Sequence, residues 1–149
     1  KVEIRKAELQ DCVIVDELLT KLIIDEKQYD NNIDENFKVS SYYKNYYDKE
    51  SDCLLVGVID DKIIGYIYGY IKDDANIINK EAKLDALYVE EDYRHQGIAQ
   101  SLIDSFLNYC KEKEVKIVEV NACSENIHAI NLYKKNNFQT TKITMKQEI

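Results

Sequence analysis

The sequence contains no proline, no tryptophan and only four glycines among its 149 residues. Proline is the strongest local breaker of regular structure, so the ends of helices and strands must be inferred from Gly, Asn and Asp. No apolar run approaches the roughly 20 residues that cross a bilayer, and no segment resembles a signal peptide. These absences predict a cytoplasmic protein that does not enter a membrane.

Cysteine is present, but without the spacing of a metal or redox motif. The four cysteines form no Cys-x-x-Cys pair: Cys12, Cys53, Cys110 and Cys123. Reduced thiols in a cytoplasm are the simplest account of them. The two histidines, His95 and His128, have no ligand spacing either, so no metal site is predicted.

Positive charge is in deficit, with 20 Lys and Arg against 28 Asp and Glu and a formal net charge of −8. A nucleic-acid groove needs a basic stripe to neutralise phosphates, so this class of partner is not expected. A negative field concentrates cationic substrates, but acidity also serves solubility. The net charge therefore does not show whether the substrate is cationic or whether the acidic residues only keep the protein soluble.

The apolar pattern predicts one α/β domain over residues 1–149, of ordinary size for a single domain. Strands are predicted at residues 2–6, 53–59, 62–71, 82–89 and 115–122, with one or two closing strands over 138–149. Helices are predicted at residues 12–24, 37–47, 98–111 and 126–135, the first capped by Asp11. A tight turn at Asp60-Asp61 makes residues 53–71 a hairpin. This order predicts a mixed sheet with helices on both faces.

The most informative segment runs from an apolar strand through a short loop into a long amphipathic helix. Arg94-His-Gln-Gly97-Ile-Ala99 stands where the helix begins. A helix start has unpaired backbone N–H groups and a partial positive charge, so a phosphate binds there readily. Gly97 allows a close backbone approach, and Arg94 adds a charge. The same sequence could also be an ordinary helix start beside a surface Arg. Only the strand–loop–helix context favours an anion-binding site over that interpretation.

With this segment the sequence resembles the GNAT superfamily of N-acyltransferases, over nearly its whole length and most specifically from Leu84 to Phe138. The resemblance implies a mixed, mostly antiparallel sheet of about six or seven strands flanked by about four helices. The sheet would splay at the two strands that hold acetyl-CoA. Its diphosphate would bind at Arg94, His95, Gln96, Gly97, Ile98 and Ala99, and its pantetheine arm along Leu87, Tyr88 and Val89.

A second block supports the same resemblance: Asn126-Ile-His-Ala129-Ile-Asn-Leu-Tyr133-Lys-Lys-Asn-Asn-Phe138. By resemblance Asn126 contacts the pantetheine or caps the helix, and Tyr133 donates its hydroxyl proton to the leaving coenzyme A sulfur. A phenol with a pKa of about 10 is protonated at neutral pH, as this role requires. The alternative for Tyr133 is a core aromatic. Asn137 replaces the family's usual Gly, and Asn is the next-best residue for a left-handed helix end.

The chemistry requires an oxyanion donor and a way to remove a proton from the amine. The resemblance implies a bulge whose backbone N–H serves as the donor, and Leu87 is the candidate. Asp85, two residues away, is the candidate base and Glu81 the second choice. Asp85 could equally pair with Lys83 or face solvent. A covalent route through Cys123 is disfavoured, since no neighbour in the sequence suggests activation.

The acceptor amine is expected to bind the N-terminal part of the chain. Tyr42 and Tyr46 would share a helix face and, with Glu26 and neighbouring acids, form a cup for a cation. The alternative is an amphipathic helix that half-buries its tyrosines against the sheet.

The leading function is therefore transfer of an acetyl group from acetyl-CoA to the primary amine of a small molecule, directly in a ternary complex. A protein or peptide acetyltransferase and a non-catalytic acyl-CoA sensor are alternatives. A homodimer is left open, as is use of other acyl groups.

Overall fold

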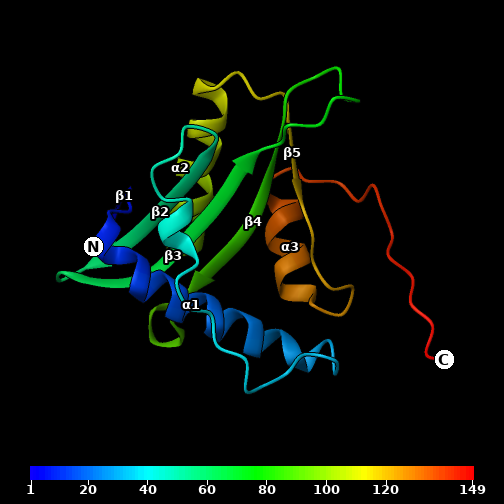
Figure 1. Ribbon diagram of the computed structural model, residues 1–149, viewed down its shortest axis with the longest axis horizontal. Coiled ribbons are helices and arrows are strands. Elements are labelled where there is room, and N and C mark those ends of the chain that lie inside the picture. The colour runs from blue at the N-terminus through cyan, green and yellow to red at the C-terminus, as the bar shows by residue number, and fades with distance from the viewer.

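One mixed sheet of five strands organises the computed structural model, which describes residues 1–149 (Figure 1). The strands are β1 (Glu3–Lys6), β2 (Asp52–Ile59), β3 (Lys62–Ile71), β4 (Glu81–Val89) and β5 (Ile117–Val120). They lie in chain order; β1 to β4 are antiparallel neighbours, and β5 is parallel to β4. A parallel neighbour requires a crossover, which a helix provides here.

Three α-helices accompany the sheet: α1 (Cys12–Asp25), α2 (Ile98–Glu112) and α3 (Ile127–Lys135). Short 3₁₀ turns occur at η1 (Leu9–Asp11), η2 (Glu26–Gln28), η3 (Tyr43–Asn45) and η4 (Glu91–Tyr93). None of the helices combines the length and apolarity that a membrane crossing requires. The predicted mixed sheet with helices on both faces is confirmed, but six or seven strands and four helices were too many.

The two faces of the sheet form two separate apolar clusters. Val15 and Leu18 of α1 pack with Tyr43 and with Tyr66 of β3 on one face. On the other face, α2 contributes a stripe of buried residues: Ile98, Leu102, Ile103, Phe106 and Cys110. The period of 3.6 residues in that stripe is the pattern from which the helix was predicted. Each face thus has its own helix, and the chemistry of the two faces can differ.

The hairpin prediction is confirmed by the backbone of its turn. Asp60 and Asp61 have φ values of 50° and 63°. Two left-handed residues between paired strands match the twist of a two-residue hairpin, and Asp tolerates this conformation better than most residues.

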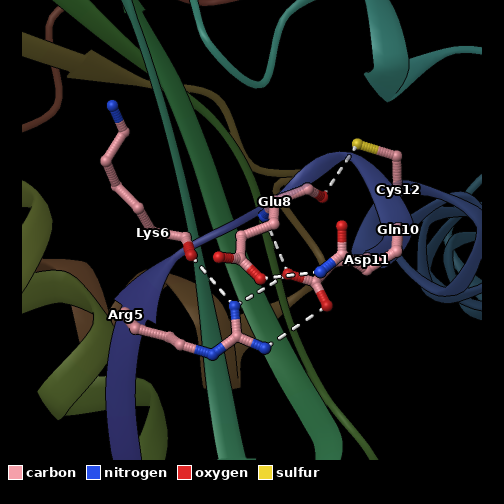
Figure 2. Close-up of polar contacts among 6 residues, drawn as sticks. All are labelled: Arg5, Lys6, Glu8, Gln10, Asp11 and Cys12. Atoms are coloured by element: carbon pink, nitrogen blue, oxygen red, sulfur yellow. Dashed lines mark hydrogen bonds and ion pairs between the residues drawn. The ribbon is translucent and has the colours of Figure 1, made fainter.

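The start of α1 is held by a buried carboxylate (Figure 2). Asp11 accepts a hydrogen bond from the Glu8 backbone N–H at 2.8 Å and two from the Arg5 guanidinium at 2.7 and 3.3 Å. The Arg5 hydrogen bonds, supported by the Glu8 N–H and the Arg5 charge, hold the pKa of Asp11 below its usual value. Asp11 precedes α1 as predicted, but its side chain accepts no hydrogen bond from the N–H groups of that helix. It instead ties the end of β1 to the first turn.

The helix predicted at residues 37–47 is wrong. Only η3 forms there, because side chains of α1 bind the backbone N–H groups that a helix would use. Asp16 accepts hydrogen bonds from the N–H groups of Tyr42 and Tyr43 at 3.3 and 3.0 Å, and Thr20 accepts one from Val39 at 2.9 Å. Side-chain acceptors of this kind compete directly with helical hydrogen bonding.

The closing strands predicted over residues 138–149 are also absent. The backbone of residues 139–149 makes no hydrogen bond within the chain, and a strand without a partner is not regular structure. The strand predicted at 115–122 is shortened to β5. Figure 1 shows the C-terminal segment running outside the sheet, apart from β5.

Candidate active site

The two parallel strands separate halfway along β4. Residues Glu81–Leu84 pair with Ile117–Val120, and β4 then continues through Val89 with β3 on one side and no strand on the side of β5. The splay implied by the family resemblance is therefore present. It leaves one side of the second half of β4 with unpaired backbone groups, which an extended ligand can bind as an added strand would.

A β-bulge lies where the strands separate. Tyr68 pairs with Ala86 and Gly69 pairs with Leu84, so Asp85 is the extra residue. The bulge was expected at Leu87, and the structure places it two residues earlier. An extra residue bends the strand and leaves its own backbone groups outside the ladder, which makes a bulge suited to a reactive site.

The Leu87 backbone N–H still faces the open side of β4. The N–H of Glu90 donates to the Ile64 carbonyl of β3 at 2.8 Å. Because backbone groups alternate sides along a strand, those of Leu87 and Val89 point away from β3. The Val89 carbonyl agrees with this, since it accepts a hydrogen bond from Arg94 Nε at 2.7 Å rather than from β3. Leu87 therefore carries a donor at the open edge.

The loop before α2 presents a row of free donors. Gly97 is the N-cap of α2 with φ of 80°, and no side chain caps the helix. The N–H groups of Ile98, Ala99 and Gln100 donate to no acceptor in the protein, and the first helical bond runs from Ser101 to Gly97. Such a helix start binds anions through its N–H groups and its dipole.

This loop fits a diphosphate sterically as well. A Cβ placed on Gly97 would meet no atom within 4 Å, so the space in front of the loop is open. His95 also has a positive φ of 65°. His95 and Gln96 are exposed at the loop surface, while Ile98 is buried against the sheet and anchors the helix start. Of the residues predicted to bind the coenzyme diphosphate, His95, Gln96 and Gly97 thus lie at the surface, whereas the Ile98 side chain belongs to the core and only its backbone N–H is free.

Arg94 is held by the protein rather than left free. Besides its bond to Val89, its guanidinium lies 3.4 Å from the Asp25 carboxylate and 5.2 Å from the centre of the Tyr88 ring. The Asp25 pair is exposed and contributes at most about 1 kcal/mol. Arg94 therefore links the loop to the end of α1 and can exchange this weak partner for a phosphate at small cost.

Helix α3 has the ends that the sequence predicted. The Asn126 side chain accepts a hydrogen bond from the Ala129 N–H at 3.1 Å, so Asn126 caps the helix. Asn137 adopts φ of 70°, and the Phe138 and Asn137 N–H groups bond to Tyr133 and Lys134 carbonyls, each at 3.0 Å. This is the Schellman arrangement, and Asn137 serves in it as the usual Gly would.

The Tyr133 side chain is half-buried beside the α2-face cluster. Its ring packs edge-on against Phe138 with centroids 5.7 Å apart. Burial, followed by the charge of Glu26, raises the pKa of Tyr133 to about 12. Its hydroxyl makes no hydrogen bond to the protein and is not a buried unpaired group. Tyr133 is therefore both a packing residue and a protonated donor that remains available to a ligand.

A link between α2 and α3 was not predicted. The side-chain amides of Gln100 and Asn136 exchange two hydrogen bonds, at 2.6 and 3.0 Å. This pair joins the first turn of α2 to the end of α3 and fixes Tyr133 relative to the anion-binding loop. No spacing in the sequence signals it, because the partners are 36 residues apart.

Asp85 lies beside a group of tyrosines on the α1 face. Its charge is among the causes that raise the pKa values of Tyr42, Tyr66 and Tyr70. The Asp85 side chain is open to solvent, yet the surrounding protein removes part of its hydration and raises the pKa of its carboxyl; Lys83 opposes this. No ion pair with Lys83 forms within 4.0 Å. Glu81, the second candidate base, is paired with Lys72 at 3.4 Å.

The tyrosine group is larger than predicted. The ring centroids of Tyr42 and Tyr46 are 5.1 Å apart, although η3 rather than a helix brings them together. Tyr43 and Tyr66 have their hydroxyls 3.0 Å apart. Tyr66, Tyr68 and Tyr70 of β3 complete the group, and their alternation along the strand is the signal that could have placed them.

Glu26 is not part of that tyrosine group. It begins η2, and burial and the charge of Asp30 raise the pKa of its carboxyl. Its charge acts on Tyr133 and Cys123. The single cup expected from Tyr42, Tyr46 and Glu26 is therefore divided between two places. Burial also raises the pKa of the Cys123 thiol, which opposes its use as a nucleophile.

Two surface hollows of about 400 and 410 Å³ include none of the residues predicted to bind the coenzyme or the acceptor. One is lined by charged side chains that include Arg5 and Glu90, and the other by α1 and residues 39–41. The open side of β4, the α2 helix start and Tyr133 together offer donors suited to an acyl-coenzyme. No three His, Cys, Asp or Glu side chains are grouped so as to hold a metal ion.

The sequence profile of the acetyltransferase (GNAT) family matches residues 18–138. The match covers the splayed strands, the α2 helix start and α3, and the chain belongs to this family. N-acetyltransferase 8 of Homo sapiens is 25% identical over 103 residues, which are 69% of this chain and 45% of that protein. The chain thus spans less than half the length of this curated relative.

Solved structures agree on the fold. The tetramutant of the BH1408 protein from Bacillus halodurans superimposes with a TM-score of 0.86 at 22% identity, over 99% of both chains. An aminoglycoside acetyltransferase, meta-AAC0020 from a soil metagenome, solved in complex with sisomicin, gives a TM-score of 0.75 at 16% identity, over 99% of this chain and 96% of that one. At these identities the likeness establishes the fold alone.

Proposed function

We propose that this protein transfers an acetyl group from acetyl-CoA to the primary amine of a small cationic molecule. The observation that carries the proposal is the row of free N–H groups at the start of α2, next to the unpaired half of β4. Membership of an acetyltransferase family supports it, and so does the solved relative whose name describes acetyl transfer to aminoglycosides.

The coenzyme would be held in two parts. Its diphosphate accepts hydrogen bonds from the N–H groups that follow Gly97, with Arg94 beside it, and His95, Gln96, Ile98 and Ala99 shape the loop. Its pantetheine arm would lie along Leu87, Tyr88 and Val89, where β4 has no strand on the side of β5. Asn126 caps α3, and its amide would also contact the arm. When bound, the coenzyme supplies an activated thioester.

The residues of the chain then do three things. The Leu87 N–H, on the open side of β4, stabilises the negative charge that develops on the thioester oxygen. Asp85, close to this point and more basic than an ordinary carboxylate, accepts the proton that the amine loses. Tyr133 keeps its proton at neutral pH and donates it toward the departing sulfur. The transfer is direct, because the Cys123 thiol has no activating partner.

The acceptor amine would approach from the α1 face. Tyr42 and Tyr46 present aromatic surface beside Asp85, and such a combination attracts an organic cation. Lys49 already lies 5.4 Å from the Tyr46 ring centre, so Tyr46 accommodates a cation without rearrangement. Glu26, near Tyr133, would bind a second positive group of the same molecule.

A thiol-release assay with acetyl-CoA and a panel of amines tests the proposal. Polyamines, aminoglycosides and amino-acid amides should accelerate release, whereas peptides with free N-termini should not. Acceleration by peptides alone would indicate a protein acetyltransferase, and acetyl-CoA binding without acceleration by any amine would indicate a sensor. Tyr46→Ala should raise the KM for the amine and leave acetyl-CoA affinity unchanged.

A further inference from the structure

The tyrosine group lies between two carboxylates, of which the proposed transfer uses only Asp85. The other is Asp52, the first residue of β2, whose carboxylate accepts a hydrogen bond from the Tyr68 hydroxyl at 2.9 Å. Strand β3, which carries Tyr68, runs between β2 and β4 (Figure 1). Burial is the main cause of the raised pKa values of Tyr42 and Tyr68, and the charges of both aspartates add to it. The acceptor surface is therefore bounded by an acid at each side.

The protein neutralises neither of these carboxylates. No Lys or Arg forms an ion pair with Asp52 or Asp85. The nearest cation to Asp85 is Lys83, whose charge also acts on Glu119 of β5. Asp52 is half-buried, and its second carboxylate oxygen accepts no hydrogen bond. A partly desolvated carboxylate with a free oxygen attracts a cation more strongly than one in open water.

A cation of the chain already rests on this surface beside Asp52. Lys49 Nζ lies 5.4 Å from the centre of the Tyr46 ring, and that ring packs on Tyr68 with centroids 6.0 Å apart. The backbone of Lys49 is close to Asp52 as well, since its carbonyl accepts the Asp52 N–H at 3.1 Å. The Lys49 side chain is exposed and forms no ion pair. An exposed cation held only by a ring is held loosely, so a ligand ammonium can take its place.

The surface between the two acids is mainly aromatic. Three rings of the group are at least partly exposed there: Tyr42, Tyr46 and Tyr70. The buried rings beneath them use their hydroxyls within the protein. A spacer of methylene groups loses contact with water favourably on such rings, whereas a spacer rich in hydroxyls would give up hydrogen bonds to water for few in return. The surface therefore favours an alkyl chain between two charges.

The sheet sets the distance between the two acids. Strands β2 and β4 are two strand spacings apart, about 10 Å. Asp52 is in register with Tyr70 and Tyr70 with Lys83, and Asp85 lies two residues beyond Lys83, about 6 Å along β4. The Cα atoms of the two aspartates are therefore about 11 Å apart. Their side chains shorten the gap that a ligand must span, which suits a short linear chain.

We infer that the acceptor is a linear α,ω-diamine, with its reacting amine at Asp85 and its second ammonium on Tyr46 beside Asp52, in the place of Lys49. The inference rests on the proposed function and narrows its substrate to a dication of defined length. The reacting ammonium loses its proton to Asp85 and becomes a neutral amide, so the product keeps only the charge at Asp52. Glu26, near Tyr133, is the competing position for the second ammonium.

Binding and turnover of matched amines by the full chain test the inference. Calorimetric titration compares putrescine and cadaverine with butylamine and pentylamine, which have the same chains but a single ammonium. The diamines should bind at least about tenfold more tightly, because the second ammonium gains a hydrogen bond to a charged, partly buried acid. This advantage should shrink at high salt. Thiol release with acetyl-CoA should rank the amines in the same order of kcat/KM.

Variants assign the position of the second ammonium. Asp52→Asn should remove the advantage of the diamines, and it should fold, because an amide oxygen still accepts the Tyr68 hydrogen bond. Asp48→Asn is the matched control, since it makes the same change of charge in the same segment and the charge of Asp48 acts on Cys12 of α1. It should keep the full advantage. Lys49→Ala should tighten diamine binding about two- to fivefold, whereas Lys49→Arg, which keeps a cation, should not.

Binding and turnover fail separately. Equal affinity for diamines and monoamines, no binding of any amine, an advantage that survives Asp52→Asn, or one lost in Glu26→Gln but not in Asp52→Asn would each overturn the inference. Unchanged diamine binding in Lys49→Ala would overturn it as well. Selective binding of diamines without thiol release would refute the acetyltransferase function and leave the diamine site standing. Thiol release that is equally fast with monoamines and diamines would do the reverse.

Discussion

Tyr133→Phe tests the most specific part of the proposed chemistry, because it removes one oxygen atom and little else. The hydroxyl makes no hydrogen bond to the protein, and the ring keeps its edge-on contact with Phe138. The free energy of unfolding should therefore change by less than about 0.5 kcal/mol. Acetyl-CoA affinity should also persist, since the diphosphate donors belong to α2.

The expected loss in kcat follows from the leaving group. A positioned general acid contributes roughly 10²–10⁴-fold. A thiol with a pKa of about 8.5 leaves more easily than an alcohol or amine would, so it needs less help. We therefore expect a loss at or below the low end, about 10- to 100-fold, or about 1.4–2.7 kcal/mol of transition-state stabilisation.

The measurement is initial-rate thiol release at saturating acetyl-CoA, with coenzyme affinity and melting temperature determined in parallel. Tyr47→Phe is the matched control, since Tyr47 is also half-buried but packs against the α1-face cluster. A Tyr133→Phe enzyme that turns over like the unmodified protein would refute the leaving-group role. A loss confined to coenzyme affinity would show that Tyr133 only shapes the binding surface.

Substitutions at four further residues have defined outcomes. Asp85→Asn should lower kcat/KM at least about tenfold at neutral pH and abolish the acid limb of its pH profile; Lys83→Ala should move that limb to higher pH, because Lys83 lowers the Asp85 pKa. Asn126→Ala should lower the free energy of unfolding by about 1 kcal/mol through loss of the helix cap, and Asn126→Ser, which can also cap, should restore it. If the amide also contacts the coenzyme, both variants should have a raised KM for acetyl-CoA. Asp11→Asn should destabilise the fold by about 1–2 kcal/mol in denaturant titrations. Because folding lowers the Asp11 pKa, the Asp11 carboxylate stabilises the fold at pH values above its unfolded-state pKa, and this stabilisation is lost as the pH falls through its folded-state pKa. The Asp11→Asn variant should lack this part of the acid-induced fall in the free energy of unfolding.

The elements that the sequence predicted well are those whose period is set by burial on one face. The limits of α1, α2, β2, β3 and β4 agree with the structure within a residue or two. In α2 every buried residue belongs to a single stripe, which leaves no competing interpretation of the pattern. The ends of α3 were also predictable, because Asn126 and Asn137 act through local backbone geometry.

The failures occurred where distant side chains decide local structure. Tyr42 and Tyr46 are spaced as on a helix, but hydrogen bonds from Asp16 of α1 hold the segment in another conformation. No local pattern carries that information. The Gln100–Asn136 pair is a similar case, since two amides separated by 36 residues have no recognisable spacing.

The bulge at Asp85 would let β4 serve both substrates of the proposed reaction. Before it, Ala82 and Leu84 face the α2 cluster; after it, Leu87 and Val89 do, while Tyr88 faces the α1 cluster. In a regular strand the alternation that begins at Leu84 would place Tyr88 on the α2 face. One extra residue therefore reverses the faces of the second half of β4. With this reversal Tyr88 joins the α1-face cluster and Val89 joins the α2-face cluster. It also leaves Asp85 beside the tyrosine group, while the open backbone of Leu87 faces the proposed coenzyme site. The same residue that lets the strands part thus brings the proposed base next to the proposed oxyanion donor.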